Sequence, residues 1–372
     1  MSSFINGPIN YIQLNGSINN IQKNITIFLD LHLDINNQTR CDSFDSIDIS
    51  QYLYKLIKNI TVPLDFFLEI REEQLYQPIT NKRDIYIAEV IEMFKSEFII
   101  EQDKIKYSKS NPNVRLHYLD IRDHLKFLYV INQLNIKIFP ILKSLKNENI
   151  SYDDKINKLE QLKQYIENIK KYIIDVIDNK INIQQTKLIN YDKKSQDYYL
   201  NKIIHIYKHK SVKSSINKFL NIFVLNYFTE FIKLIMDFNQ SIINYKLNIT
   251  NDSHLIKLFD LYSKLYDNIL LLYGTITDVY FLRRFLDKDY IQNTITYCGR
   301  NHALNYIYFL VKYYNFTITN IYNTGGLTIN DIIYKIKETD DLDKIHNLFL
   351  FEGEKPKQCV TKPRSEFYNL GW

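Results

Sequence analysis

The sequence is poor in the residues that mark turns, linkers and disulfide frameworks. Its 372 residues include only 8 glycines, 7 prolines, 3 cysteines and 1 tryptophan. Glycine and proline thus fall well below their usual shares of about 7% and 5%. Internal repeats and low-complexity runs are also lacking, whereas 45% of the residues are hydrophobic and 24% are charged. These proportions are typical of a globular protein with one large domain or two ordinary ones.

The cysteines are too few and too scattered for a disulfide framework. They are Cys41, Cys298 and Cys359, and no two of them have the C-x-x-C spacing of a structural zinc ribbon. An odd and sparse set of cysteines favours a reducing compartment. We therefore expect an intracellular protein without a disulfide framework.

Basic residues are not concentrated in any part of the chain. The 47 lysines and arginines are interspersed with 42 aspartates and glutamates, and the net charge is +5. A dedicated nucleic-acid-binding domain is usually more basic, with its lysines and arginines clustered. We therefore do not expect nucleic acid among the partners.

The most apolar stretch, residues 216–236, still carries Lys218, Glu230 and Lys233. A free membrane span needs about 20 predominantly apolar residues, so this stretch indicates a core helix. The first residues lack a basic segment followed by an apolar run, which argues against a signal peptide. We expect no membrane association.

Apolar runs and helical patterns alternate near both ends of the chain. Short apolar runs predict strands at residues 24–33, 64–70, 114–121, 294–299 and 316–322. Segments with helical spacing follow them at residues 47–60, 83–99, 301–315 and 328–350. Strands that alternate with helices indicate an α/β protein with a mostly parallel sheet and flanking helices.

The middle of the chain has a different pattern. Residues 151–181 repeat apolar side chains at three- and four-residue steps, after a capping pair of Ser151 and Asp154. Further long helices follow. We predict two halves of an α/β core at residues 1–122 and 291–350, a large helical insertion or cap at 123–290, and a polar C-terminal tail at 351–372.

Polar and titratable residues gather where four of the predicted strands end. They are Asp30, His32 and Asp34 on the first strand, Glu69 and Arg71 on the second, Arg115, His117, Asp120, Arg122 and Asp123 on the third, and Cys298, Gly299, Arg300 and His302 on the late strand. Ligands of parallel α/β sheets bind at the carboxyl ends of the strands. We therefore expect a functional site at this edge of the sheet.

Three of these residues, His32, Glu69 and His302, are the candidate catalytic residues. Two imidazoles and a carboxylate can hold a divalent metal and leave a position open for water, which then becomes a nucleophile near neutral pH. The same three residues are therefore the candidate metal ligands, and a divalent metal is the candidate cofactor. Without a metal, one histidine would act as general base and a carboxylate would orient it.

Other polar residues at the strand ends are candidates for substrate binding. They are Asp30, Arg115, His117, Arg122 and Arg300. Arginines can hold an anionic or carboxylate group in a fork geometry. Structural roles stay open as well. The arginines and aspartates of residues 115–123 also fit an ion-pair network, and His32, between two leucines, also fits a satisfied core histidine.

Two short motifs resemble those of a known group. Gly299-Arg300-Asn301-His302 looks like the G-x-x-H motif of the TraB/Tiki/GumN and ChaN-like/erythromycin-esterase group. Leu29-Asp30-Leu31-His32 resembles the group's first motif, G-[ET]-x-H, with leucine in place of the glycine, and Glu69 matches the acid that ends its second strand. The resemblance implies the TraB/erythromycin-esterase-like fold, with a hydrolase-type site that is metal-dependent or uses a histidine base.

Taken whole, the sequence is similar to uncharacterised proteins of large nucleocytoplasmic DNA viruses of the mimivirus kind. The similar segments are residues 4–16, 28–41, 115–123, 277–285 and 297–306. This resemblance implies a protein of the infected-cell cytoplasm, or one packaged in the virion, and it implies no known activity.

Two hypotheses from different classes follow. The first is a hydrolase-like protein, metal-assisted or histidine-dependent, that acts on a small molecule or peptide. The second is a catalytically inert scaffold or virion-associated protein that retains the fold and binds other virion proteins. The replacement of the first motif's glycine by Leu29 motivates the second hypothesis.

Overall fold

A computed structural model divides the chain into two compact units. The described residues are 3–71, 74, 84–101, 104–125, 127–147, 149–177, 202–203, 205–249, 252–348 and 357–363. Unit 1 comprises Met1–Asp120 and Arg284–Trp372, and unit 2 comprises Ile121–Arg283. Most of the predicted polar tail, residues 351–356 and 364–372, lies outside the described residues.

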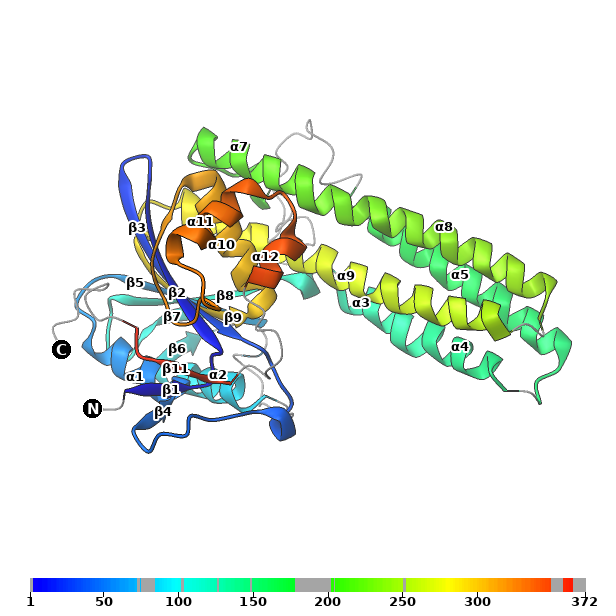
Figure 1. Cartoon of the computed structure of the whole chain (residues 1–372), viewed down its shortest axis with the longest axis horizontal. Helices are drawn as coiled ribbons and strands as arrows, with labels where there is room; N and C mark the ends of the chain where they lie inside the picture. Colours follow the sequence, from blue (N-terminus) through cyan, green and yellow to red (C-terminus); the bar gives the residue numbers. More distant parts are fainter. Residues whose placement is uncertain are drawn as a thin grey trace. The chain divides into compact units, whose positions relative to one another are not determined.

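Unit 1 is built around a six-stranded sheet (Figure 1) with the order β10-β2-β3-β9-β5-β8. Its strands are β2 (Asn10–Ile18), β3 (Ile21–Asp30), β5 (Leu64–Arg71), β8 (Val114–Asp120), β9 (Asn293–Gly299) and β10 (Thr317–Ile321). Neighbours from β3 to β8 are parallel, whereas β2 is antiparallel to both β3 and β10. The α/β class is confirmed. The sheet is mixed and not mostly parallel throughout, because β2, a strand that was not predicted, runs antiparallel to its neighbours.

The strand β2 was not predicted because polar residues interrupt its hydrophobic pattern. Asn10 and Gln13 are each only 1% exposed. Asn10 donates a hydrogen bond to the Asn323 carbonyl and Gln13 donates one to Thr26 Oγ1, so neither amide is buried at the full cost of a lost hydrogen bond. The strand turns directly into β3 at Asn19 and Asn20, whose φ values of 49° and 66° asparagine tolerates.

Helices cover both faces of this sheet. The chain steps from β3 to β5 and from β5 to β8 in one direction along the sheet, and from β9 to β10 in the other. Right-handed crossovers then place α1 (Ile49–Asn59) and α2 (Ile85–Glu97) on one face and α10 (Arg300–Tyr314) on the opposite face. In Figure 1, α11 (Ile329–Glu338) and α12 (Leu342–Leu348) lie beside α10.

Because both faces are covered, the inner strands are apolar along their length. Phe66, Phe67 and Leu68 of β5 are each 0% exposed, and Ile27 and Phe28 of β3 are at most 1% exposed. Full burial of one such side chain stabilises the fold by about 1.5–3 kcal/mol. This core fixes the strands whose ends carry the polar residues.

A three-stranded sheet, β11-β1-β4, joins distant parts of unit 1. Its strands are β1 (Phe4–Asn6), β4 (Ser46–Asp48) and β11 (Cys359–Thr361), and β6 (Phe98–Glu101) and β7 (Lys104–Ser108) form a separate hairpin. A disulfide links Cys41 to Cys359, the first residue of β11. The sequence analysis argued against a disulfide framework and did not predict this single bridge, whose cysteines are 318 residues apart and are brought together by the fold.

Among its described residues, unit 2 is built from α-helices. They are α3 (Phe127–Asn132), α4 (Phe139–Leu145), α5 (Tyr152–Ile177), α7 (Lys210–Phe219), α8 (Leu225–Leu247) and α9 (Asp252–Asp287), whose last residues belong to unit 1. The predicted apolar stripe of α5 is buried from Leu159 to Val176 and packs against α8. Within the described residues, the continuous helix Lys210–Leu247 is long and apolar enough to cross a membrane by length and composition, and 39% of its most apolar window is buried.

Candidate functional site

Three neighbouring parallel strands end at the candidate site. The strands β3, β9 and β5 lie side by side, with Asp30 at the end of β3, Glu69 near the end of β5 and Gly299 at the end of β9. The connections after β3 and β5 leave on one face of the sheet, and the connection after β9 leaves on the other. Open α/β sheets bind ligands at such reversal points, outside the carboxyl ends of the strands.

Glu69 links the two predicted histidines. Its Oε2 lies 3.4 Å from His32 Nε2, and its Oε1 lies 3.2 Å from His302 Nε2. The Gly299 N–H, at the start of α10, donates to Oε2 at 2.5 Å. Burial alone would raise the pKa of Glu69, but the charge of His302 and the hydrogen bonds from both histidines hold it well below its usual value. Glu69 is therefore a carboxylate with one imidazole on each oxygen.

Gly299 is required by the close approach of His32 and Glu69 to its backbone. A Cβ at this position would lie 3.0 Å from His32 Nε2 and 3.2 Å from Glu69 Oε2. Any larger residue would push the imidazole and the carboxylate away from the start of α10. The glycine of the predicted G-x-x-H motif thus has a direct physical role.

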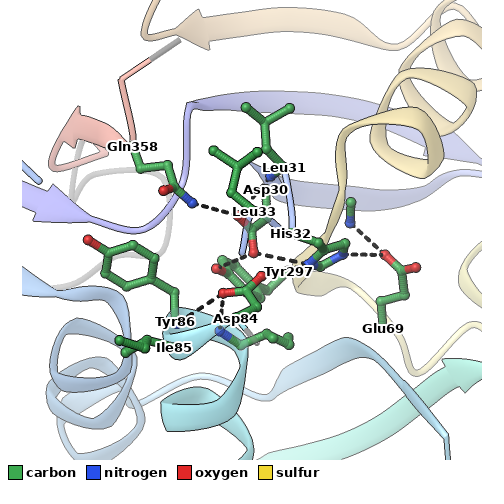
Figure 2. A network of polar contacts seen from close by, with 12 residues as sticks. Asp30, Leu31, His32, Leu33, Glu69, Asp84, Ile85, Tyr86, Tyr297 and Gln358 are labelled. Atoms are coloured by element: carbon green, nitrogen blue, oxygen red, sulfur yellow. Dashed lines mark hydrogen bonds and ion pairs between the residues drawn. The ribbon is translucent and has the colours of Figure 1, made fainter. Parts of the chain in front are cut away.

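His32 faces three carboxylates. Its Nδ1 lies 3.2 Å from both Asp30 Oδ2 and Asp84 Oδ2, and its other ring nitrogen faces Glu69 (Figure 2). Its φ of 49° is uncommon for a residue other than glycine and turns the chain sharply after β3. Burial would lower the pKa of His32, but the hydrogen bonds to Asp30, Asp84 and Glu69 raise it well above its usual value.

The imidazoles of the cluster reach solvent, and its carboxylates lie behind them. The side chains of His32 and His302 are 36% and 13% exposed, whereas those of Asp30, Asp84 and Glu69 are 0%, 8% and 9% exposed. A ligand in solution would meet the histidines first. The buried acids would then act through the rings that they hold.

The two aspartates are held in place by donors from several elements. Asp30 accepts hydrogen bonds from Tyr297 Oη at 2.8 Å and Gln358 Nε2 at 3.3 Å. Burial and the Asp30 charge raise the pKa of Tyr297 well above its usual value, so its hydroxyl stays a donor. Asp84 caps α2 by accepting from the Tyr86 N–H at 3.1 Å, and it also accepts from Gln38 Nε2 at 2.7 Å.

Asp84 and Gln358 were missed by the sequence analysis. Asp84 carries a recognisable signal, because an aspartate just before a helix is a preferred N-cap. That signal predicts a capping role and not a position next to His32. Gln358 lies in the segment predicted to be a polar tail, yet it is 0% exposed, and nothing in its sequence context indicates burial.

The predicted substrate-binding residues are dispersed. Asp30 is completely buried behind His32 and is not exposed to a ligand in this arrangement. Arg300 is the first residue of α10, beside Gly299, and its side chain is partly buried. Arg122 belongs to unit 2, where its guanidinium lies 5.3 Å from the centre of the Phe127 ring.

Arg115 and His117 were assigned to the wrong end of their strand. Arg115 is the second residue of β8 and donates to both oxygens of Asp65, at 2.7 and 2.6 Å. His117 Nε2 lies 2.7 Å from Asp65 Oδ1. Asp65 is the second residue of β5, four positions before Glu69, which is about 13 Å along a strand. Arg115 and His117 therefore belong to an ion-pair network, which was the structural alternative left open for residues 115–123.

Asp30, His32 and Asp84 also form a potential cation site. Each offers one ligand atom, and these atoms lie within 4.8 Å of one another. Imidazole nitrogen with carboxylate oxygens is a donor set used for divalent metals such as zinc. The set differs from the predicted ligands His32, Glu69 and His302, because Asp84 was not foreseen.

Comparison with known proteins places the whole chain in a family. The family of unknown function DUF5847 matches residues 3–362. Among its relatives, the uncharacterized protein R706 of Acanthamoeba polyphaga mimivirus is 30% identical over 86% of each chain. The uncharacterized protein R161 of the same virus is 29% identical over 92% of this chain and 93% of its own.

The expected similarity to mimivirus proteins is thus confirmed. The family and these relatives give no support to the resemblance to the TraB and erythromycin-esterase group. No solved structure gives a significant match to the chain.

Proposed function

The chain belongs to DUF5847, a family of unknown function, and we propose that it is a hydrolase-like protein in which His32, Glu69 and His302 carry the chemistry. One observation supports this proposal above the others. A buried carboxylate contacts two partly exposed imidazoles at the ends of neighbouring parallel strands.

Two imidazoles on one carboxylate can divide a proton transfer between them. His302 would accept a proton from the water that attacks a carbonyl carbon, and His32, which its raised pKa keeps protonated, would donate a proton to the leaving group. Glu69 would orient both rings and stabilise the imidazolium that forms. Arg300, next to Gly299, would bind an anionic group of the substrate.

The contact distances in the cluster are consistent with this role. Charge-assisted hydrogen bonds are usually about 2.7–2.9 Å long, whereas the two histidines lie 3.2 and 3.4 Å from Glu69. Catalytic hydrogen bonds are often long without substrate and tighten when it binds. The rings therefore have room to adjust to a ligand.

The proposed substrate is a small molecule or peptide with an ester or amide bond, because nothing in the cluster restricts it further. Since the relatives are viral proteins, the proposed location is the infected-cell cytoplasm or the virion. Neither nucleic acid nor a membrane is proposed as a partner.

Hydrolysis by the purified full chain tests the proposal. Chromogenic esters and aminoacyl amides would be compared for the wild type, Glu69→Gln and His302→Gln. His254→Gln, in unit 2, is the matched control. We expect both site variants to lose activity and the control to keep it. A folded wild type that hydrolyses none of the substrates would favour the inert scaffold instead, which should then co-purify with virion proteins.

A second candidate is a metal-assisted form of the same reaction, favoured by the Asp30, His32 and Asp84 group. A divalent cation there would supply a water nucleophile. Elemental analysis after purification with added zinc should then show about one equivalent, and Asp84→Asn should abolish it. If His302→Gln abolished binding and Asp84→Asn did not, the predicted set of His32, Glu69 and His302 would be favoured over the Asp84 set.

A further inference from the structure

The Cys41–Cys359 disulfide joins two segments that hold the acids of the candidate site. Gln38, three residues before Cys41, donates to Asp84 Oδ1 at 2.7 Å. Gln358, directly before Cys359, donates to Asp30 Oδ1 at 3.3 Å. Each half-cystine is therefore preceded, within three residues, by a glutamine that contacts an aspartate facing His32.

The two segments also bind each other. The Gln358 N–H donates to Thr39 Oγ1 at 2.7 Å, and the Thr39 N–H donates to Gln358 Oε1 at 3.1 Å. Gln358 is thus fixed at both its backbone and its side chain between residue 39 and Asp30. Figure 2 shows its amide pointing at Asp30 on the side away from Glu69.

Among the described residues, the C-terminal segment is also held by an ion pair of Lys357 with Asp42 and by a short strand pairing. β11 has three residues and pairs only with β1 in its sheet, flanked by hydrogen bonds from Gly7 N–H to the Gln358 carbonyl and from Lys362 N–H to the Ser3 carbonyl. Val360 is its buried apolar anchor. The bridge ties this segment to Cys41, so a segment that opens while the rest of unit 1 stays folded remains close to its place.

Cys41 and Cys359 are both half-buried residues at the surface of the fold and not core residues. Cys298 is fully buried in β9 and takes no part in the bridge. Reduction by a dithiol breaks the S–S bond, leaves two cysteine thiols and converts the reductant to its own disulfide, with two electrons transferred.

We propose that this disulfide is a redox-controlled clamp on the candidate site. In the oxidised chain, the bridge keeps Gln358 on Asp30 and the 38–41 segment on Asp84, which positions His32. In the reduced chain, the β11 segment opens more often, and Asp30 loses its Gln358 donor. Gln358 is a positioning residue in this scheme. Its effect on hydrolysis rests on the proposed function, whereas its effect on the structure does not.

Hydrogen–deuterium exchange on the full chain tests the clamp directly. Thiol counting under denaturing conditions should first give one thiol, that of Cys298, before reduction and three after it. Reduction should then raise exchange at residues 357–363 and 38–41 by about tenfold or more, and leave α5 unchanged. The double variant Cys41→Ser/Cys359→Ser should exchange at the reduced rate with or without reductant, and Cys298→Ser should behave as the wild type.

Gln358→Ala separates the glutamine from the bridge. In the oxidised state, this variant should keep 357–363 protected but move the His32 ring resonances in the same direction as reduction does. Three thiols before reduction, unchanged exchange after it, or unmoved His32 resonances in both cases would each overturn the clamp. Absent hydrolysis in both redox states would count against the proposed function alone, because the exchange result does not depend on it.

Discussion

Unit 1 contains two clusters in which histidine meets a buried acid, one at each end of the same parallel strands. At the amino ends, Arg115 and His117 converge on Asp65 at 2.6–2.7 Å. At the carboxyl ends, His32 and His302 contact their acids at 3.2–3.4 Å. The first cluster is tight, and the second is loose.

The two clusters also differ in the balance between acidic and basic side chains. At the amino ends, Arg115 already neutralises Asp65, so His117 has no acid to itself. Burial, together with the charges of Arg284 and Arg115, lowers the pKa of His117 to about 4 despite its hydrogen bond to Asp65. The contact is therefore a hydrogen bond from a neutral imidazole. At the carboxyl ends, acids outnumber arginines, and the pKa of His32 is raised instead.

Exposure completes the contrast. The His117 side chain is 7% exposed and that of His32 is 36% exposed. The same residue types thus form a buried structural ion-pair network at the amino ends of the strands and an accessible, acid-rich cluster at their carboxyl ends. Residue type alone does not separate the two; charge balance and access to solvent do.

The largest expected effect is on catalysis by Glu69→Gln. The neutral amide would no longer stabilise an imidazolium, and its NH₂ group would turn one ring away. We expect kcat for any ester or amide that the wild type hydrolyses to fall by about 10²–10⁴-fold, the usual contribution of general acid–base groups.

The matching variant in the amino-end cluster is Asp65→Asn. It should leave kcat unchanged but lower the free energy of unfolding by about 1.5–3 kcal/mol, because Arg115 loses its charged acceptor. Urea unfolding and initial rates of both variants check the pair. Equal losses of activity in the two variants would erase the proposed distinction between the clusters.

The next expected effect is a pH dependence of the free energy of unfolding, caused by the titration of His117. Its pKa is about 4 in the fold and about 6.5 in an unfolded chain. Between these values the unfolded chain binds more protons, so stability is lost as the pH falls from about 6.5 to about 4. The loss should reach about 3 kcal/mol.

His117→Gln keeps a donor for Asp65 but cannot titrate in this range. The difference between urea unfolding at pH 7 and at pH 4 should therefore be smaller in His117→Gln by about that amount. Identical pH profiles for the variant and the wild type would show that His117 is not held neutral.

Gly299→Ala should act on the carboxyl-end cluster alone. The added methyl would meet His32 Nε2 at 3.0 Å and Glu69 Oε2 at 3.2 Å, so both groups must move. A displacement of this kind can lower kcat by up to about 10²-fold. Gly326→Ala is the control, because its Cβ would meet nothing within 4 Å. It should cost stability, owing to its φ of +84°, without lowering kcat.

Much of the carboxyl-end cluster could be predicted because strand ends are visible in a sequence. The runs before His32, Glu69 and Gly299 are continuous apolar segments, and parallel strands bring their ends to one edge. Leu29, which prompted doubt about the site, is a buried residue of β3 and is 1% exposed. Its side chain packs in the core, while Asp30 and His32 still join the cluster.

The rest depended on contacts between distant segments. Asp84 reaches His32 from the start of α2, and Gln358 and Cys359 arrive from the C-terminal segment. No periodicity encodes such pairings. The position of Arg115 and His117 was misjudged for a simpler reason. Their polar run spans the strand from its start, and a sequence pattern alone does not show which end faces the other acids.

The last variant, Arg115→Gln, tests the role of charge balance most directly. The guanidinium is 39% exposed but Asp65 is 0% exposed, so its loss leaves a buried carboxylate without a charged donor and should cost about 1.5–3 kcal/mol of stability. Of these two partners, Asp65 would then keep only His117, and the amino-end cluster would take on the acid excess of the other. NMR titration should show the pKa of His117 rising from about 4 towards its ordinary value. If that pKa stayed at about 4, burial and the charge of Arg284 would account for the neutral imidazole, and Arg115 would not explain the difference between the two clusters.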